Sequence, residues 1–464
     1  MPLKQGIFSD IIEGVVDEIR LVCAPSIYAV FARILEHMIR DTVPIGANYY
    51  EATARRDGYP ELRAELNVDI CVIGGGIAGC STALHLATKG YRVALIEAQQ
   101  IGAGASGRSG GQLIPGYSCG QPVLQRQLGN DAARVLWDIS VEAVQLAAQL
   151  IADHQIQCEL KSGHLDAAIK PGHRDELLRH QHQLQRDYDY RSLRWVEGSQ
   201  LQALIQSDRY SAGLYDSAAA SMHPLNYTLG LARAATQCGA LIHEHSPVAH
   251  VEQTAESVRV ATSSAAVTAK YAVLCANVGN VPLSSHSTSI LPVTTYMIAT
   301  QPLDQFRDPT HPIMNPDVAV SDCNFIVDYF RVSQSRLLFG GGVSYSGHPN
   351  PLSIQYLRKR MHAVFPQLEG AQIDYAWHGL LDISRNRAPN FGRIDSNIYY
   401  LQGFSGHGLA LATMAGKLVA ESIAVQSERF DLFSRIEHRP FPGGPLRTPL
   451  LMLAMLWYRI RDLM

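Results

Sequence analysis

A short β-rich segment that ends in three consecutive glycines constrains the fold of this chain more than any other feature. Residues 68–73 read Val-Asp-Ile-Cys-Val-Ile, which is typical of a buried strand, and a GxGxxG spacing begins directly after them at Gly74. The apolar pattern predicts a helix over residues 77–89 and a second strand over residues 91–97. This order predicts a βαβ unit whose helix begins at the glycine turn.

Such a turn is suited to the phosphates of a dinucleotide. Gly74 allows the tight turn, Gly76 lets the backbone approach a pyrophosphate, and Gly79 lets the helix pack closely on the strand. Glu97 ends the second strand, where a carboxylate accepts hydrogen bonds from a ribose diol. The residues alone leave FAD and NAD open. The predicted contacts are Gly74, Gly76, Ile77, Ala78, Gly79, Glu97 and Ala98.

Two later glycine-rich segments have a similar character. Residues 101–112 contain five glycines in twelve positions, so their amides can wrap around a polar ligand, although flexible surface loops have the same composition. Residues 403–408 follow a predicted strand over 398–402 and precede a predicted helix over 409–425, which again presents amides to a negative group. His407 in this loop is either catalytic or a histidine that only shapes the turn.

The size and composition of the chain favour two intertwined domains and a small-molecule partner. Its 464 residues exceed the size at which one hydrophobic core usually stops growing. The net charge is −3 and no basic block occurs, so nucleic acid is not predicted as a partner. The eight cysteines show no metal-ligand spacing, so we predict reduced thiols and no metal site.

The two ends of the chain carry apolar stripes. Residues 7–40 predict two amphipathic helices, and residues 449–458 predict an apolar C-terminal helix that is too short to span a membrane, which takes about 20 residues. No signal peptide is recognisable. We therefore expect a cytoplasmic protein whose end helices pack on each other or in a homodimer. The alternative is peripheral contact with the inner face of a membrane, which would allow electrons to pass to a quinone.

The three glycine segments, in this order and at these separations, resemble those of the D-amino-acid-oxidase-like flavoenzymes, which include sarcosine oxidase and glycine oxidase. Within that family the chain is most similar to the gamma-glutamylputrescine oxidases, from residue 64 to the end of the sequence. The segments that carry this likeness are 104–112, 207–210, 223–226, 322–331, 337–342, 365–368, 373–377, 397–408, 441–444 and 458–462.

The resemblance implies an α/β fold in which a Rossmann-like FAD-binding domain is interleaved with an α+β substrate domain built on a mixed sheet. A helical extension over residues 1–63 would precede the fold, and an apolar helix within 436–464 would follow it. The implied FAD-binding segments are 64–150, 223–284 and 376–435, and the implied substrate-domain segments are 151–222 and 285–375.

The resemblance also implies cofactor contacts beyond the first glycine turn. Residues 106–112 would approach the pyrophosphate and the flavin, Val248 the adenine, and Gly379 with residues 406–408 the flavin ring. The complete implied set is Gly104, Ala105, Ser106, Ser109, Gly110, Gly111, Gln112, Val248, Ala276, Asn277, Gly379, Gly406, His407, Gly408 and Leu409.

Two departures from the family pattern bear on the reaction. Sarcosine oxidases hold a substrate carboxylate with a lysine two residues beyond the last glycine of the third segment, where this chain has Ala410. They also attach the flavin to a cysteine in the stretch that corresponds to Trp377–Gly403, which contains none here. We therefore expect noncovalent FAD and an amine substrate rather than an amino acid.

The family chemistry implies hydride transfer to the flavin from a carbon next to nitrogen, with oxygen as the acceptor that reoxidises the flavin. We expect gamma-glutamylputrescine or a related amine to be converted to an aldehyde or imine. Oxidation of a secondary amine or an amino acid, and a membrane-associated dehydrogenase that reduces a quinone, are the alternatives. The candidate catalytic residues, for which core packing or structural ion pairing is the competing role, are Tyr296, Tyr329, Arg331, Trp377, Arg387 and His407.

Overall fold

A computed structural model describes residues 45–277, 289–305, 312–324, 326–344, 352–424 and 426–441. The helices predicted over residues 7–40 and 449–458 lie outside the described residues. The compact unit begins at Ile45. Residues 45–63 therefore belong to it, although we predicted them as part of a helical extension.

Residues 45–63 contain one short helix, α3 (Tyr49–Thr53), and otherwise form neither helix nor strand. Tyr49, Tyr50 and Leu62 are buried with at most 1% of their surface exposed. The prediction of a separate helical piece is wrong here because these apolar side chains fill the core of the main fold. We call residues 45–63 the N-terminal strap.

The first sheet, sheet A, is built on the predicted βαβ unit, which is confirmed. Its strand β1 (Leu66–Ile73) pairs in parallel with β2 (Val93–Ile96) and with β10 (Ala266–Leu274). The order across the sheet is β16-β17-β10-β1-β2-β7; β9 also pairs with β10, and β8 pairs with β9. The remaining strands are β7 (Leu241–His243), β8 (His250–Gln253), β9 (Val258–Ala261), β16 (Asn390–Ile394) and β17 (Ile398–Gln402).

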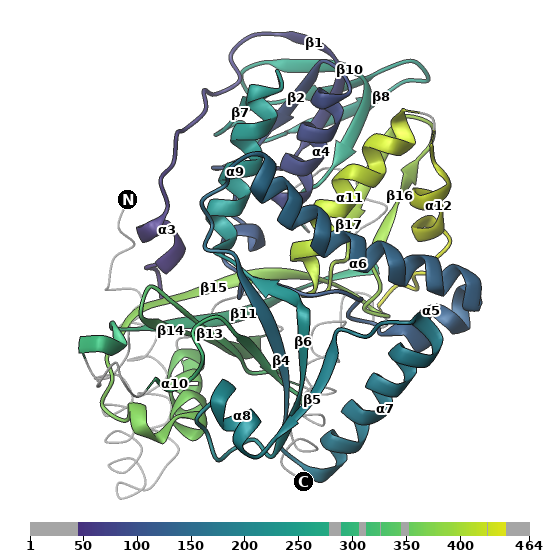
Figure 1. Cartoon of the computed structure of the whole chain (residues 1–464). Helices are drawn as coiled ribbons and strands as arrows, with labels where there is room; N and C mark the ends of the chain where they lie inside the picture. Colours follow the sequence, from purple (N-terminus) through teal and green to yellow (C-terminus); the bar gives the residue numbers. More distant parts are fainter. Residues whose placement is uncertain are drawn as a thin grey trace, which may run out of the picture. The chain divides into compact units, whose positions relative to one another are not determined.

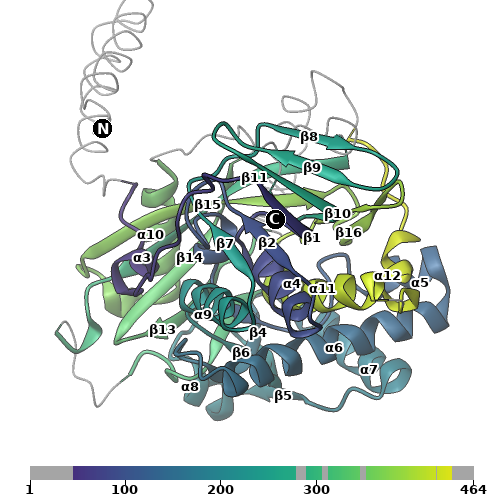
Figure 2. The ribbon, with the colours of Figure 1, turned by 90° about the horizontal axis from the view of Figure 1, so that it is seen from above.

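Helices cover one face of sheet A. In strand β1, Ile70 and Val72 belong to the core formed with these helices, whereas Cys71 and Ile73 belong to a second core on the opposite face, with residues of β8 and β9. A strand buried on both faces explains its continuous apolar run. Figure 2 shows α4 (Ile77–Thr88) between α9 (Pro224–Gln237) and α11 (Gly408–Ile423), and it contacts both.

Among the described helices, α6 (Asn130–Asp153) is long and apolar enough to cross a membrane by length and composition alone. Its apolar face packs against α11 and α5 (Gln121–Leu128), and Leu136, Ile139 and Ala147 are buried there. This packing is that of a core helix. The last described helix, α12 (Glu428–Ser434), also packs on α11.

The second sheet, sheet B, lies below sheet A in the view of Figure 1 and is mixed. Its order is β15-β11-β14-β13-β12-β4-β6-β3, and β5 pairs with β6. The strands are β3 (Gln112–Leu113), β4 (Lys161–Ala168), β5 (Leu193–Glu197), β6 (Ala212–Ser221), β11 (Ile290–Thr300), β12 (Ala319–Asp322), β13 (Tyr329–Ser333), β14 (Arg336–Ser344) and β15 (Ile373–Ser384).

Helices α7 (Pro171–Tyr188), α8 (Ser199–Leu204) and α10 (Leu352–Val364) accompany sheet B. The chain passes from one sheet to the other four times, because β3 to β6 and β11 to β15 belong to sheet B and the strands between and around them to sheet A. Strand β15 remains in sheet B up to Ser384. The predicted boundary between residues 375 and 376 therefore falls inside a strand of sheet B, and the return to sheet A occurs at β16.

Candidate cofactor and substrate site

Both sheets contribute to one large cavity of about 960 Å³. Its lining contains all three glycine segments, together with side chains from strands β4, β6, β12 and β13 of sheet B. Because the chain crosses between the sheets repeatedly, segments that are far apart in sequence meet around this space.

The first glycine segment adopts the close-packed turn that its spacing predicts. Gly74 has φ +107°, and a Cβ there would lie 2.9 Å from the backbone of Ala276. A Cβ on Gly79 would lie 1.9 Å from the carbonyl oxygen of Gly74. Only glycine fits at these two positions. The N-terminus of α4 therefore faces the cavity, and its N-cap residue, Gly76, has no side chain that could occupy the free amides.

Two side chains order the residues around this turn. The Glu97 carboxylate accepts hydrogen bonds from the amides of Gly75 at 2.6 Å and Gln99 at 2.8 Å. Ser106 Oγ accepts from the amide of Ile77 at 3.0 Å, which links the second glycine segment to the first turn of α4. The carboxylate that we predicted as a ribose ligand thus already stands at the end of β2 and lines the cavity.

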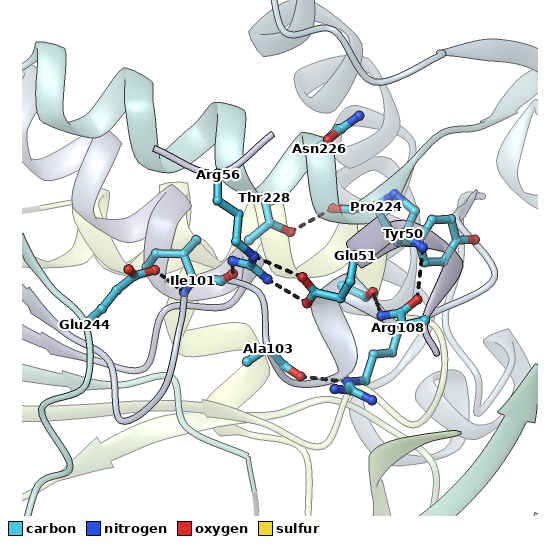
Figure 3. Close-up of polar contacts among 12 residues, drawn as sticks. Tyr50, Glu51, Arg56, Ile101, Ala103, Arg108, Pro224, Asn226, Thr228 and Glu244 are labelled. Atoms are coloured by element: carbon cyan, nitrogen blue, oxygen red, sulfur yellow. Dashed lines mark hydrogen bonds and ion pairs between the residues drawn. The ribbon is translucent and has the colours of Figure 1, made fainter. Parts of the chain in front are cut away.

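The N-terminal strap holds the second glycine segment in place, as Figure 3 shows. Arg56 forms an ion pair with Glu51 at 2.6 Å and donates from Nη1 to the carbonyl oxygen of Ile101 at 2.7 Å. On the other side of this residue, Glu244 accepts from the amide of Ile101 at 2.7 Å. Arg108, within the segment, donates to the carbonyl oxygen of Ala103 at 2.8 Å.

A buried carboxylate holds the third glycine segment. Asp382 accepts from the amide of Gly403 at 2.6 Å, and burial raises its pKa to about 6. His407 Nε2 lies 3.2 Å from the carbonyl oxygens of Ile114 and of Pro115, so this nitrogen carries the proton and donates. Burial lowers the pKa of His407, which keeps the ring neutral. In this geometry, His407 joins two lining segments and caps α11 only through its backbone.

Nearly all of the predicted cofactor contacts line the cavity. They are Gly74, Gly76, Ile77, Ala78, Glu97, Ala98, Gly104, Ala105, Ser106, Ser109, Gly110, Gly111, Gln112, Val248, Ala276, Asn277, Gly379, Gly406, His407, Gly408 and Leu409. Gly79 lies behind them, where it lets α4 approach the turn at Gly74. Their contact with a cofactor stays a prediction.

The arrangement fits a dinucleotide on structural grounds. Two helix N-termini, those of α4 and α11, face the cavity, and each offers backbone amides to negative charge. Ser109 Oγ also lines the cavity and is buried with no hydrogen-bond partner in the described part of the chain. A buried hydroxyl of this kind is satisfied when a polar ligand binds beside it.

The six candidate catalytic residues divide into two groups of three. Tyr329, Arg387 and His407 line the cavity. Tyr296 is fully buried and does not line it; its neighbour Thr295 does, because successive side chains of strand β11 point to opposite faces.

Arg331 and Trp377 lie beneath the second glycine segment rather than in the cavity lining. Arg331 Nε donates to the carbonyl oxygen of Gly110 at 3.1 Å, and Trp377 Nε1 donates to that of Arg108 at 2.9 Å. Both side chains are at least 98% buried. We therefore revise their role from substrate contact to support of the loop that covers them.

A polar group on sheet B was not predicted from the sequence. His164 and Asp166 are two residues apart on β4, and Asp216 on β6 pairs with His164, so these side chains share the face that lines the cavity. Ser321 on β12 pairs with Asp166 and extends the same face. No motif joins positions separated by about 50 and 100 residues, and only the strand register brings them together.

The chain is similar to known oxidoreductases along most of its length. Residues 69–422 match the DAO family, described as FAD dependent oxidoreductase. The chain is 36% identical to gamma-glutamylputrescine oxidoreductase of Escherichia coli over 422 residues, or 90% of this chain and 98% of that protein. It is likewise 36% identical to a probable oxidoreductase, OrdL, of Haemophilus influenzae, over 89% of this chain and 96% of that protein.

Solved structures show the same fold at lower identity. Glycine oxidase from Geobacillus kaustophilus matches with a TM-score of 0.67 and 20% identity, over 81% of this chain and 100% of that one. L-Proline dehydrogenase from P. horikoshii matches with a TM-score of 0.66 and 19% identity, over 81% and 98%. Together with the family match over residues 69–422, these findings confirm the expected fold and cofactor: the chain belongs to the DAO family of FAD-dependent oxidoreductases.

Proposed function

We propose that this enzyme oxidises a primary amine, gamma-glutamylputrescine or a close relative, with noncovalently held FAD and with oxygen as the electron acceptor. The observation that carries the proposal is the 36% identity to gamma-glutamylputrescine oxidoreductase over 98% of that protein. The cavity that joins the glycine segments to a polar face of sheet B agrees with it, since cofactor and substrate must meet in one space.

We assign the ADP part of FAD to the turn at Gly74 and to Glu97, and the flavin to the residues around Gln112, Gly379 and Gly406. Bound there, FAD supplies the hydride acceptor for oxidation of the carbon next to the amine nitrogen. The chain positions the amine and excludes water, and the amides at the N-terminus of α11 stabilise negative charge that develops next to them. Ala410, buried in α11, offers no cation to a substrate carboxylate at this point.

Three further assignments complete the proposal. Sheet A with its helices forms the FAD-binding domain, and sheet B forms the substrate domain, so the domains are interleaved along the chain. Tyr329 and Arg387 are the candidate catalytic residues that line the cavity, and His407 positions the lining. We place the enzyme in the cytoplasm, with homodimerisation or peripheral membrane contact assigned to the chain ends.

An anaerobic titration tests the reaction. Purified protein mixed with gamma-glutamylputrescine under nitrogen should lose its oxidised-flavin absorbance, and admission of air should restore it with release of hydrogen peroxide. An oxidised spectrum that persists with this amine and with a panel of primary amines would contradict the proposed function.

The choice of acceptor needs its own measurement. Flavin that bleaches with the amine but is reoxidised much faster by a soluble quinone than by air would identify a dehydrogenase instead of an oxidase. Precipitation with trichloroacetic acid supplies the control for the cofactor linkage, because noncovalent FAD stays in the supernatant.

A further inference from the structure

The part of the cavity that lies against sheet B carries uncompensated negative charge. Asp166 on β4 and Asp216 on β6 both line it. Among the described ion pairs, neither carboxylate meets a lysine or an arginine, and Asp166 has only His164, whose Nδ1 lies 3.8 Å from Asp166 Oδ1. We call this region the acidic end of the cavity.

The histidines at the acidic end do not neutralise these carboxylates. Burial lowers the pKa of His164 to about 4 and also lowers that of His180, so both rings are neutral near pH 7. Burial raises the pKa of Asp166 and of Asp216. This holds even though 43% of the Asp166 side-chain surface is accessible, because that surface faces the cavity. Entry of a cation next to a carboxylate in such surroundings stabilises the charged form of the carboxylate.

Aromatic rings complete the surroundings of a cation. The Tyr190 hydroxyl donates to the Asp216 carboxylate, at 2.9 and 2.8 Å from its two oxygens. Trp137 packs edge-on against Tyr190 with ring centroids 5.2 Å apart, and both side chains line the cavity. Carboxylates next to aromatic rings are the surroundings that proteins use for ammonium groups.

A buried amide donor at the same end also points to a ligand. Gln121 lines the cavity with only 4% of its surface exposed, and its Nε2 has no hydrogen-bond partner within the described residues. Its Oε1 accepts from the hydroxyl of Tyr188 at 3.4 Å, and the Tyr188 ring packs against Trp137. An unpaired buried donor is costly, and a carbonyl or carboxylate oxygen of a ligand would satisfy it.

The acidic end is connected to the side of the cavity where we place the flavin. His164 Nε2 lies 3.2 Å from Ser321 Oγ, and Ser321 Oγ donates to Gln112 Oε1 at 3.1 Å. A substrate can therefore reach from Gln112 towards Asp166 within one cavity.

We propose that the acidic end binds a second, protonated amino group of the substrate through Asp166 and Asp216, while Gln121 donates to a neighbouring oxygen. The enzyme then selects amines that carry an ammonium group beside a carbonyl or carboxylate at the end remote from the carbon that is oxidised. This inference rests on the proposed function, and it names the substrate class that the site takes.

A pair of substrates and a pair of variants test it. The substrates are gamma-glutamylputrescine and its α-N-acetyl derivative, which keeps the reactive amine but lacks the remote ammonium charge. The first variant is Asp166→Asn; the Asp166 carboxylate accepts no hydrogen bond from the described residues, so the substitution breaks none. The second is Asp138→Asn, which removes the same charge at an exposed position of α6 outside the cavity.

The wild-type enzyme should have a KM roughly tenfold higher for the acetylated amine, as expected when one charge-assisted hydrogen bond is lost. Asp166→Asn should raise KM for the parent amine by a similar factor, with KM for the acetylated amine and both kcat values changed less than about twofold. Asp138→Asn should match the wild type.

Equal wild-type KM values for the two amines would overturn the inference, and so would an Asp166→Asn variant that raises both KM values alike. A wild-type flavin that neither amine reduces would overturn the proposed function itself and the inference with it. The flavin spectrum and the Tm of each variant, unchanged from those of the wild type, show that the fold is intact.

Discussion

His223 shows how one neutral side chain connects the strap to the helical layer. Its Nδ1 accepts from the amide of Asn226 and so caps α9, while its Nε2 lies 3.0 Å from Thr53 Oγ1. Burial lowers the pKa of His223 to about 4. An Nδ1 that accepts a hydrogen bond requires the neutral ring, so the geometry and the pKa agree.

Acid should therefore weaken the fold through His223. The unfolded chain takes up a proton near the ordinary histidine pKa of about 6.5, whereas the folded chain does so only near 4, so stability present above pH 6.5 is lost as the pH falls towards 4. Between pH 7 and pH 5, the wild type should lose roughly 1–2 kcal/mol more than His223→Asn, which keeps a capping side chain. Denaturant unfolding of the holoenzyme at the two pH values measures this.

His182 supplies the control for that comparison. It lies exposed on α7, and His182→Asn should leave the pH dependence of the wild type unchanged. Equal pH dependence in His223→Asn and the wild type would show that His223 is not the responsible group.

At the scale of elements, the N-terminal strap supports the second glycine segment. The Arg56 side chain is 18% exposed and ties Glu51 of α3 to the carbonyl oxygen of Ile101. Arg56→Ala should raise the Kd for FAD by roughly tenfold, because a charge-assisted hydrogen bond that orders the segment is lost. Titration of each apoprotein with FAD, monitored by quenching of flavin fluorescence, gives the Kd of the wild type and that of Arg56→Ala.

Arg63 in the same strap is the matched control. Its side chain is 81% exposed and pairs only with Glu61 among the described residues, so Arg63→Ala should bind FAD like the wild type. If Arg56→Ala binds FAD as tightly as Arg63→Ala does, the strap does not order the site.

At the scale of the whole molecule, one cavity is lined by residues of two interleaved sheets. Residues of sheets A and B line the same space, and the chain crosses between them four times, so neither sheet can unfold without breaking the site. The protein should unfold in a single transition, and removal of FAD should lower the Tm of that transition. The shift should be roughly 3–5 °C relative to protein with free FAD at about 100 times Kd, which corresponds to ~2.7 kcal/mol.

Calorimetry with and without added FAD distinguishes this coupling from independent domains. Two separate transitions, of which only one moves with FAD, would contradict the expected cooperativity. A matched scan with added NAD is the control, since a ligand that does not bind leaves the transition in place.

Local sequence determined the glycine turns that line the cavity. The strand before Gly74, the turn itself and helix α4 are neighbours in the chain. The positive φ of Gly74 and the contact of a Gly79 Cβ with the Gly74 carbonyl oxygen both arise within that unit, so spacing alone predicts these glycines. The strand and helix around residues 403–408 were predicted for the same reason. Short-range geometry leaves little freedom in such turns.

Only the tertiary structure decided the polar group on sheet B. Asp166, Asp216 and Ser321 meet through the register of β4, β6 and β12, which depends on pairing between distant segments, and a shift of one residue would turn each side chain to the opposite face. The burial of the N-terminal strap could not be predicted for the same reason. Tyr50 is buried by the core of the main fold, and no feature of the short helix α3 indicates this.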